Sequence, residues 1–553
     1  MSTTRLISVA LLLGWGPLAV AQTDLPDSLR FTVRKDYVPV ARDAARIVPQ
    51  PKAEADTITK MTMRYEVLPR QAATVVAVEP IQAAKLTNEP LEKITPGHAR
   101  IGFGNYTMPL VEVGYGTVRN KNLRASGLAR YNASYAKLDG RPFGFTDLDL
   151  MAQGSYFWKD YTIDGRVNYA HDRNFFYGYN PTDTSFTSDE VSQYFHRTAI
   201  ELGIGSTDRL KPKMLSDVRF RYGYTADRYN SVEHAVGVQA QLAFPIKNSR
   251  MFANVAGAYY GNAMPSGSRN NGIIALGPEF SMIRERWAIA IGINLGLDIY
   301  DTTTQVSAFP KINFHYFLVK DIWKLYADAT GGFLRNGLDG MSQRNPWMQT
   351  DFAQRNSTQH FLLKAGFKGI IIKRLTYDVG ISETVTANMP FFVNDFSNGI
   401  GNRFNIEYHD VNIFGINGEL GYLWGERLTT AAKVEYRFFT MPNDSIKPWH
   451  ESPFRFSFNA RYNLRDKIII KAEIYAQGVR QAKTTYVDNE GAVRVKAIDL
   501  AGYADVNLGA EYRYRKWIGA FIDLRNIAAL RYEQYYLYPS QRFGVMAGLN
   551  FNF

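Results

Sequence analysis

The chain has 553 residues, no cysteine and a formal net charge of +12, and 14% of its residues are aromatic. The lack of cysteine excludes disulfides, cysteine-ligated metals, a thiol nucleophile and a lipid anchor on an N-terminal cysteine. The basic residues form no cluster of the kind that nucleic-acid binding requires, so no nucleic acid is expected as a partner.

The N-terminus predicts a secretory signal peptide. Residues 1–5 carry one positive charge, and the apolar run Leu6–Val20 leads into a small-x-small cleavage sequence, Ala-Val-Ala. A transmembrane anchor is the alternative, but glycines and a proline interrupt the run, which is shorter than the roughly 20 residues of a span. We expect residues 1–21 to be removed after export.

Residues 22–98 differ in composition from the rest of the chain. They hold eight of the 23 prolines and show little alternation of apolar and polar residues. Such a composition predicts little regular structure. The segment is expected to be an N-terminal extension that either lies in the periplasm or fills the lumen of a barrel formed by residues 99–553.

Residues 99–553 show strand after strand with a period of two. Clear examples are Trp287–Ile299 and Phe454–Leu464, and the last eleven residues, Phe543–Phe553, alternate without a break and end on an aromatic residue. In a strand this period makes one face apolar and the other polar. Because mean hydropathy is low at −0.25 while aromatics are abundant, the pattern predicts an all-β, transmembrane antiparallel β-barrel.

Turns and loops give an expected strand count. Short charged turns such as Lys159-Asp160 and Lys373-Arg374, several beside tryptophan, are expected to face the periplasm. Long polar segments between them are expected to be extracellular loops: 179–192, 261–271, 334–357, 386–410, 440–453, 480–498 and 528–541. If 386–410 is a single excursion, and if strands begin near Ala99 and Val111, the count is about 22, with 18 as the lower bound.

No residue pattern points to catalysis or to metal or cofactor binding. The eight histidines form no HxH or HExxH pattern and no GxSxG serine motif occurs, so we assign no catalytic, cofactor-binding or metal-binding residues and expect no cofactor. Charged residues are expected on the inner faces of the strands, where they either pair across neighbouring strands or line a passage for solute. They are Asp164, Arg166, Arg197, Glu201, Arg219, Arg221, Lys324, Asp328, Lys433, Glu435, Arg437, Arg455, Arg461, Lys471, Glu473, Glu511, Arg513, Asp523 and Arg525.

Short motifs resemble TonB-dependent receptors of the Bacteroidetes type. They are Leu524–Ile527, Tyr535–Pro539 and Arg542–Val545 near the C-terminus, and Pro80–Leu86, Glu89–Leu91 and Gly102–Tyr106 at the start of the barrel. The resemblance covers roughly residues 80–553 and implies an outer-membrane barrel of a Gram-negative bacterium. The chain differs from that family in that residues 22–98 do not predict a standard plug domain.

The sequence supports three hypotheses about function. The first is solute transport or uptake by a TonB-dependent receptor-like barrel. The alternative is a non-enzymatic structural or accessory subunit of an outer-membrane complex, and an outer-membrane barrel enzyme is a third, less favoured hypothesis. The expected partners are outer-membrane lipid and lipopolysaccharide, a small-molecule or oligomeric solute, and an outer-membrane or periplasmic protein.

Overall fold

A computed structural model of the chain describes residues 94–553, except 183–185, 209–212, 248, 302, 320–321, 398–399 and 488–492. The chain divides into two units, Met1–Glu89 and Pro90–Phe553, and the described residues belong to the second. The predicted signal peptide and nearly all of the predicted N-terminal extension lie outside the described residues.

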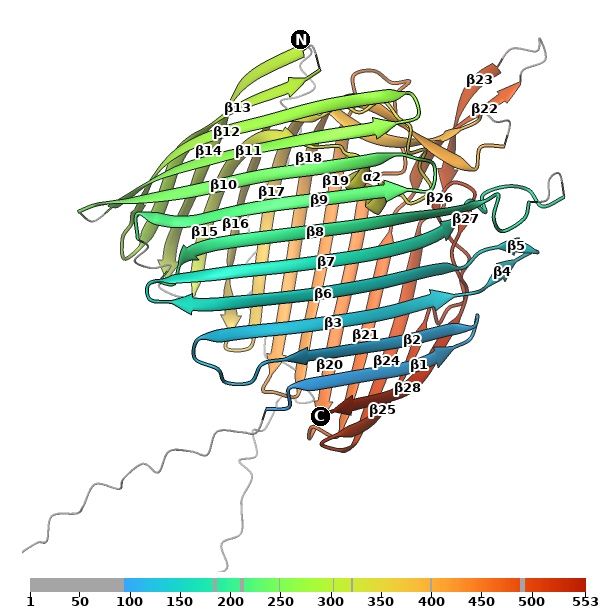
Figure 1. Cartoon of the computed structure of the whole chain (residues 1–553), viewed down its shortest axis with the longest axis horizontal. Coiled ribbons are helices and arrows are strands. Elements are labelled where there is room, and N and C mark those ends of the chain that lie inside the picture. The colour runs from blue at the N-terminus through green and yellow to red at the C-terminus, as the bar shows by residue number, and fades with distance from the viewer. Residues whose placement is uncertain are drawn as a thin grey trace, which may run out of the picture. The chain divides into compact units, whose positions relative to one another are not determined.

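Residues 97–552 form a closed antiparallel barrel of 22 strands (Figure 1). The ring closes where β1 pairs with β28, from His98 opposite Asn552 to Gly104 opposite Met546. The barrel strands are β1 (Gly97–Gly104), β2 (Met108–Gly116), β3 (Leu123–Ser134), β6 (Phe145–Trp158), β7 (Tyr161–Phe175), β8 (Ser192–Ser206), β9 (Leu215–Asp227), β10 (Val232–Ile246), β11 (Ser249–Met264), β12 (Gly267–Ile283), β13 (Trp287–Tyr300), β14 (Thr303–Val319), β15 (Trp323–Leu334), β16 (Ser357–Ile372), β17 (Leu375–Asp395), β18 (Arg403–Trp424), β19 (Leu428–Thr440), β20 (Phe454–Leu464), β21 (Ile468–Gln477), β24 (Tyr503–Arg515), β25 (Ile518–Arg525) and β28 (Gly544–Asn552). The predicted fold class and strand count are confirmed.

The outer face of the barrel is an apolar belt. Alternate residues of each strand point outward and remain largely uncovered, as Leu202 (54% exposed), Val238 (47%) and Ile291 (50%) illustrate. A water-soluble monomer rarely exposes a continuous apolar surface of this extent, so lipid is the solvent that this belt requires. Among the described helices, none has the length and apolar character needed to cross a membrane.

The two ends of the barrel differ. Ten short turns lie at one end, together with the start of β1 and the end of β28, and eleven mostly longer connections lie at the other end (Figure 1). In outer-membrane barrels the short turns face the periplasm and the long loops face outward. We therefore call them the inner end and the outer end.

Two of the predicted outer loops lie at the outer end but are much shorter than predicted, because barrel strands occupy most of their residues. Within 261–271, β11 runs to Met264 and β12 begins at Gly267, and within 386–410 only residues 396–402 connect β17 to β18. These hairpins project beyond the apolar belt, where both faces of a strand meet water or other loops. The alternation that marks a strand in lipid is lost there although the backbone ladder continues.

The outer connections also contain regular structure of their own. Their described residues form one short helix, α2 (Leu338–Arg344), and three small hairpins. The hairpins are β4 (Lys137–Leu138) with β5 (Arg141–Pro142), β22 (Arg480–Val487) with β23 (Val493–Leu500), and β26 (Glu533–Tyr535) with β27 (Tyr538–Pro539).

Candidate functional site

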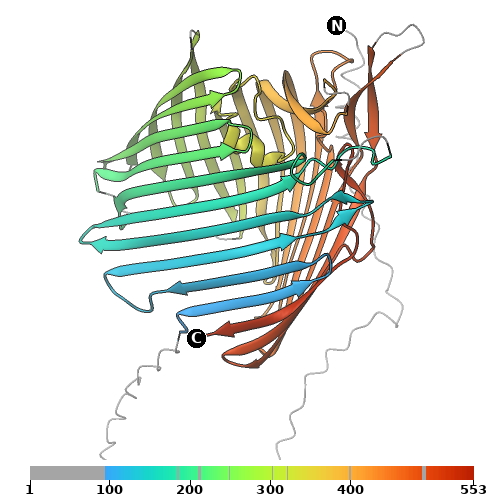
Figure 2. The same ribbon diagram turned by 45° about the vertical axis from the view of Figure 1, so that its right-hand side comes forward.

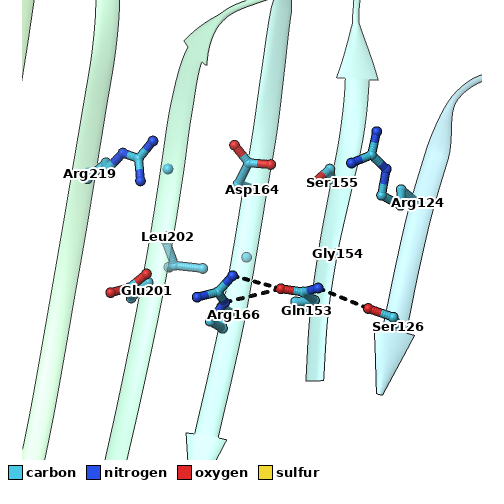
Figure 3. A pocket seen from close by; sticks show the side chains of 12 residues that line it. Arg124, Ser126, Gln153, Gly154, Ser155, Asp164, Arg166, Glu201, Leu202 and Arg219 are labelled. Atoms are coloured by element: carbon cyan, nitrogen blue, oxygen red, sulfur yellow. Dashed lines mark hydrogen bonds between the residues drawn. The ribbon is translucent and has the colours of Figure 1, made fainter. Parts of the chain in front are cut away.

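The inner faces of β3 and β6–β9 carry a row of polar side chains toward the lumen. Ser126, Gln153, Arg166, Glu201 and Arg221 lie opposite one another in the strand register. Arg166 Nη2 donates to Gln153 Oε1 (2.8 Å), and Gln153 Nε2 donates to Ser126 Oγ (3.1 Å), as Figure 3 shows. The row borders a cavity of about 360 Å³ on the lumen wall. This part of the wall therefore presents paired and hydrogen-bonded polar groups to the lumen.

The predicted inward charges are partly paired across the wall. Arg221 and Glu201 form an ion pair on neighbouring strands (3.2 Å), as expected. Arg437 and Arg455 instead share Glu451, a residue of the outer connection 441–453 (3.0 and 3.3 Å). Wall charges near the outer end thus hold a loop in place in addition to balancing one another.

The connection between β15 and β16 folds into the barrel. We call residues 335–356 the mouth segment; it includes α2, which both views place inside the ring of strands near the outer end (Figures 1 and 2). The segment leaves the wall at β15 and reaches strands β8 to β13 on one side and the β25–β28 connection on the other. It therefore crosses the outer mouth of the barrel.

Charged and amide groups fix the mouth segment to the wall. Arg335 Nη2 lies 3.0 Å from Glu233 Oε2 of β10, and both side chains are largely buried (13% and 6% exposed). Asn356 Nδ2 donates to both oxygens of Asp298 on β13 (2.9 and 3.0 Å). Arg197 of β8 donates to Ser342 Oγ of α2 (2.9 Å). These bonds anchor both ends and the helix of the segment to the wall.

A glycine allows the closest of these contacts. Glu233 Oε2 accepts a hydrogen bond from the backbone N–H of Leu338 (3.0 Å), at the start of α2. A Cβ atom at Gly337 would lie 2.2 Å from the same oxygen, so a side chain there excludes the carboxylate. The Leu338 N–H belongs to the first turn of α2 and has no acceptor within the helix. Its position at the start of a helix is also a favourable place for the negative charge of Glu233.

An aromatic cluster closes the centre of the mouth. It consists of Tyr177, Trp347, Phe404, Tyr535 and Tyr538, contributed by four different outer connections or strand ends. The ring of Tyr538 lies 4.3 Å from that of Trp347 and 4.8 Å from that of Tyr177, measured between centroids. Tyr538 is 1% exposed and its hydroxyl donates to the Asn402 carbonyl, and burial raises its pKa so that it stays protonated. The cluster joins opposite sides of the ring by apolar contact.

His450, in the outer connection 441–453, joins the outer part of β17 to the β25–β28 connection. Its Nδ1 lies 2.9 Å from the Phe392 carbonyl and its Nε2 lies 3.2 Å from the Tyr536 backbone nitrogen. The carbonyl only accepts and the N–H only donates, so these contacts select the neutral tautomer with the proton on Nδ1. Burial, and secondarily the positive charge of Arg480, lowers the pKa of His450 to about 4.

A second cavity lies between the mouth segment and the wall. Its volume is about 380 Å³, and its polar lining includes Arg197, Glu233, Tyr260, Arg335, Asp339 and Gln343. Groups of both charge signs, a phenol and an amide converge on it. Among the described residues, no group of three or more His, Asp or Glu side chains is placed to hold a metal ion.

Apart from Arg197, which was among the predicted inward charges, the sequence alone did not identify the residues of this cavity and its anchors. The contacts of Arg335 with Glu233 and of Asn356 with Asp298 each join residues more than 50 positions apart in the chain. One signal was present: the predicted loop 334–357 contains Leu338, Trp347 and other apolar residues that an exposed loop does not need. Apolar residues in an otherwise polar loop indicate that it packs against something.

We expect Arg335→Met to release the mouth segment. The substitution leaves the buried Glu233 carboxylate without its cation, a loss of about 3–5 kcal/mol for a buried pair. Hydrogen exchange should show loss of protection over residues 335–356, while the barrel strands stay protected.

Arg221→Met is the matched control, because its ion pair with Glu201 is exposed (51% and 36%) and such pairs contribute at most about 1 kcal/mol. Equal effects of the two substitutions would contradict the assigned role of Arg335.

Comparison with known proteins supports the fold. No protein-family model and no curated protein matches the sequence. Solved structures similar to the chain include the pyoverdine outer membrane receptor FpvA of Pseudomonas aeruginosa PAO1 (TM-score 0.60, 12% identity, 84% of this chain and 79% of that one). The FrpB iron transporter of Neisseria meningitidis (0.64, 9%, 84% and 82%) and the copper transporter OprC (0.59, 11%, 84% and 82%) are also similar. At 9–12% identity this likeness shows the fold alone, and the barrel fold that the resemblance predicted is confirmed.

Proposed function

We propose that the protein is an outer-membrane receptor that takes up a small solute and is closed on its outer side until the solute binds. The main support for this proposal is the anchored mouth segment, which lies across the barrel. Between this segment and the wall lies a polar cavity of about 380 Å³. A passage that served free diffusion would not need such a cover.

The similar structures support a class of solute. Their titles name a pyoverdine receptor, an iron transporter and a copper transporter. A cavity with arginine, carboxylate, phenol and amide groups suits a polar solute with several donors and acceptors, such as a metal chelate of an organic ligand. We therefore propose ferric siderophores and copper complexes as the first compounds to test.

Trp347 provides a reporter for solute binding. The purified full chain is titrated with a panel of ferric siderophores and copper(II) complexes while tryptophan fluorescence is recorded. We expect one class to give a saturable change, because binding beneath the mouth segment alters the surroundings of the half-buried Trp347.

Trp347→Phe should abolish the change, whereas Trp517→Phe, at an exposed position (52%) near the inner end, should retain it. A chain that responds to no member of the panel and co-purifies with a stoichiometric protein partner would instead favour the accessory-subunit hypothesis.

A further inference from the structure

The positive charge of the barrel gathers at its inner end. The ten short turns contain 27 described residues, of which 13 are Lys or Arg and 5 are Asp or Glu. The eleven outer connections contain 111 described residues, again with 13 Lys or Arg but with 10 Asp or Glu. The excess charge is therefore concentrated in the short turns and nearly balanced at the outer end.

These basic side chains are exposed around the whole circumference. Lys159, Lys247, Lys373, Arg427 and Lys516 stand in five turns, spread from the β6–β7 turn to the β24–β25 turn, and are all exposed. Among the described carboxylates, none lies within ion-pair distance of Lys373, Arg427 or Lys516. Their charges are thus available to a ligand that surrounds the barrel.

Exposed tryptophans lie directly beside these cations. Trp158 (49% exposed), Trp424 (49%) and Trp517 (52%) adjoin the turns, and the ammonium nitrogen of Lys159 lies 5.7 Å from the centroid of the Trp158 ring. Tryptophan on a lipid-facing surface marks the level of the headgroups. The neighbouring cations therefore lie at the height of the lipid phosphates.

We propose that the inner end of the barrel binds anionic phospholipid headgroups of the phosphatidylglycerol type in the leaflet that surrounds it. A ring of charge matches a ligand that encircles the protein, whereas a docked protein would need a patch on one side. Lipopolysaccharide was an expected partner, but it lies in the opposite leaflet, where the outer connections are nearly neutral. The proposal is independent of what the lumen carries.

Lipid selectivity tests the proposal. The full chain is reconstituted in phosphatidylcholine vesicles that contain brominated phosphatidylglycerol or, in parallel, brominated phosphatidylcholine, and quenching of tryptophan fluorescence is measured. We expect phosphatidylglycerol to be preferred several-fold at low salt, and the preference to decrease as salt screens the charges. The triple variant Lys373→Gln, Arg427→Gln, Lys516→Gln should lose part of the preference.

A matched variant removes three cations from the outer connections: Lys137→Gln, Lys496→Gln, Arg542→Gln. It should keep the full preference. Equal quenching by the two lipids in the unsubstituted chain overturns the proposal, and this measurement needs no variant to fold. Unchanged selectivity in the inner triple variant also overturns it, and loss of a co-purified acidic protein from that variant would then assign the ring to a protein partner.

Discussion

Replacing residues 338–352 with a Gly-Ser linker of equal length should open the barrel. A 22-stranded barrel is wide enough to enclose an aqueous channel unless something fills it. The replaced residues include α2 and Trp347, so the linker loses both the wall anchors at Arg197 and the contact with Tyr538. In planar bilayers, we expect a chain lacking residues 22–93 to show ionic current at least about tenfold higher with the linker than with the native segment.

Omitting residues 22–93 from both chains removes any contribution of the N-terminal segment to closure.

Replacing residues 442–445 with Gly-Ser is the control, since this exposed stretch belongs to another outer connection and should leave the current unchanged. If the linker chain carries no more current than the native one, the mouth segment is not what closes the barrel.

The same measurement in the full chain then separates the two possible closures. If residues 22–93 also occupy the lumen, the linker raises the current only when they are removed. The sequence left open whether that segment hangs in the periplasm or fills the lumen, and the comparison of the four chains decides between them.

The barrel was predictable from the sequence because lipid imposes a rule on every strand. Val545, Leu549 and Phe551 had to alternate with Met546 and Gly548, since one face of β28 meets lipid and the other the lumen. The same rule located β1 and β2 and gave the count of 22. It holds only inside the membrane, so it misassigned the hairpin ends at 261–271 and within 386–410.

The structure of the mouth was not predictable from the sequence, because no rule of this kind applies outside the membrane. α2 has seven residues, too few for a periodic pattern, and it forms where Glu233 accepts from its first turn. From the sequence, Tyr538 and Phe404 are assigned to loops, because nothing in their local sequence indicates that their rings contact each other. Closure depends on contacts between distant parts of the chain, and these contacts give no local signal.

Acid should weaken the closure of the mouth through His450. In the closed mouth its pKa is lowered to about 4, whereas an exposed histidine in the open mouth titrates near 6.5. The open state therefore binds a proton between these values while the closed state does not. Closure is fully stable above pH 6.5 and loses up to about 3 kcal/mol as the pH falls to 4.

Charged and titratable neighbours do not reverse this sign. Arg480 opposes protonation of His450 in the closed mouth, while Glu451 favours it, and Tyr535 is neutral in this range because burial raises its pKa. Protonation would also turn Nε2 into a donor facing the donor N–H of Tyr536. Burial and this lost bond together outweigh the attraction of Glu451.

Hydrogen exchange over residues 448–452 and 535–538, corrected for the intrinsic pH dependence, measures the effect. Protection should fall from pH 6.5 to pH 4 in the unsubstituted chain and remain constant in His450→Gln, whose amide keeps a donor and an acceptor without titrating. His360→Gln, at an exposed position on β16, should behave as the unsubstituted chain does. If His450→Gln shows the same acid loss, another group controls the mouth. Since the open state binds the proton, a solute that opens the mouth should shift the loss of protection to higher pH.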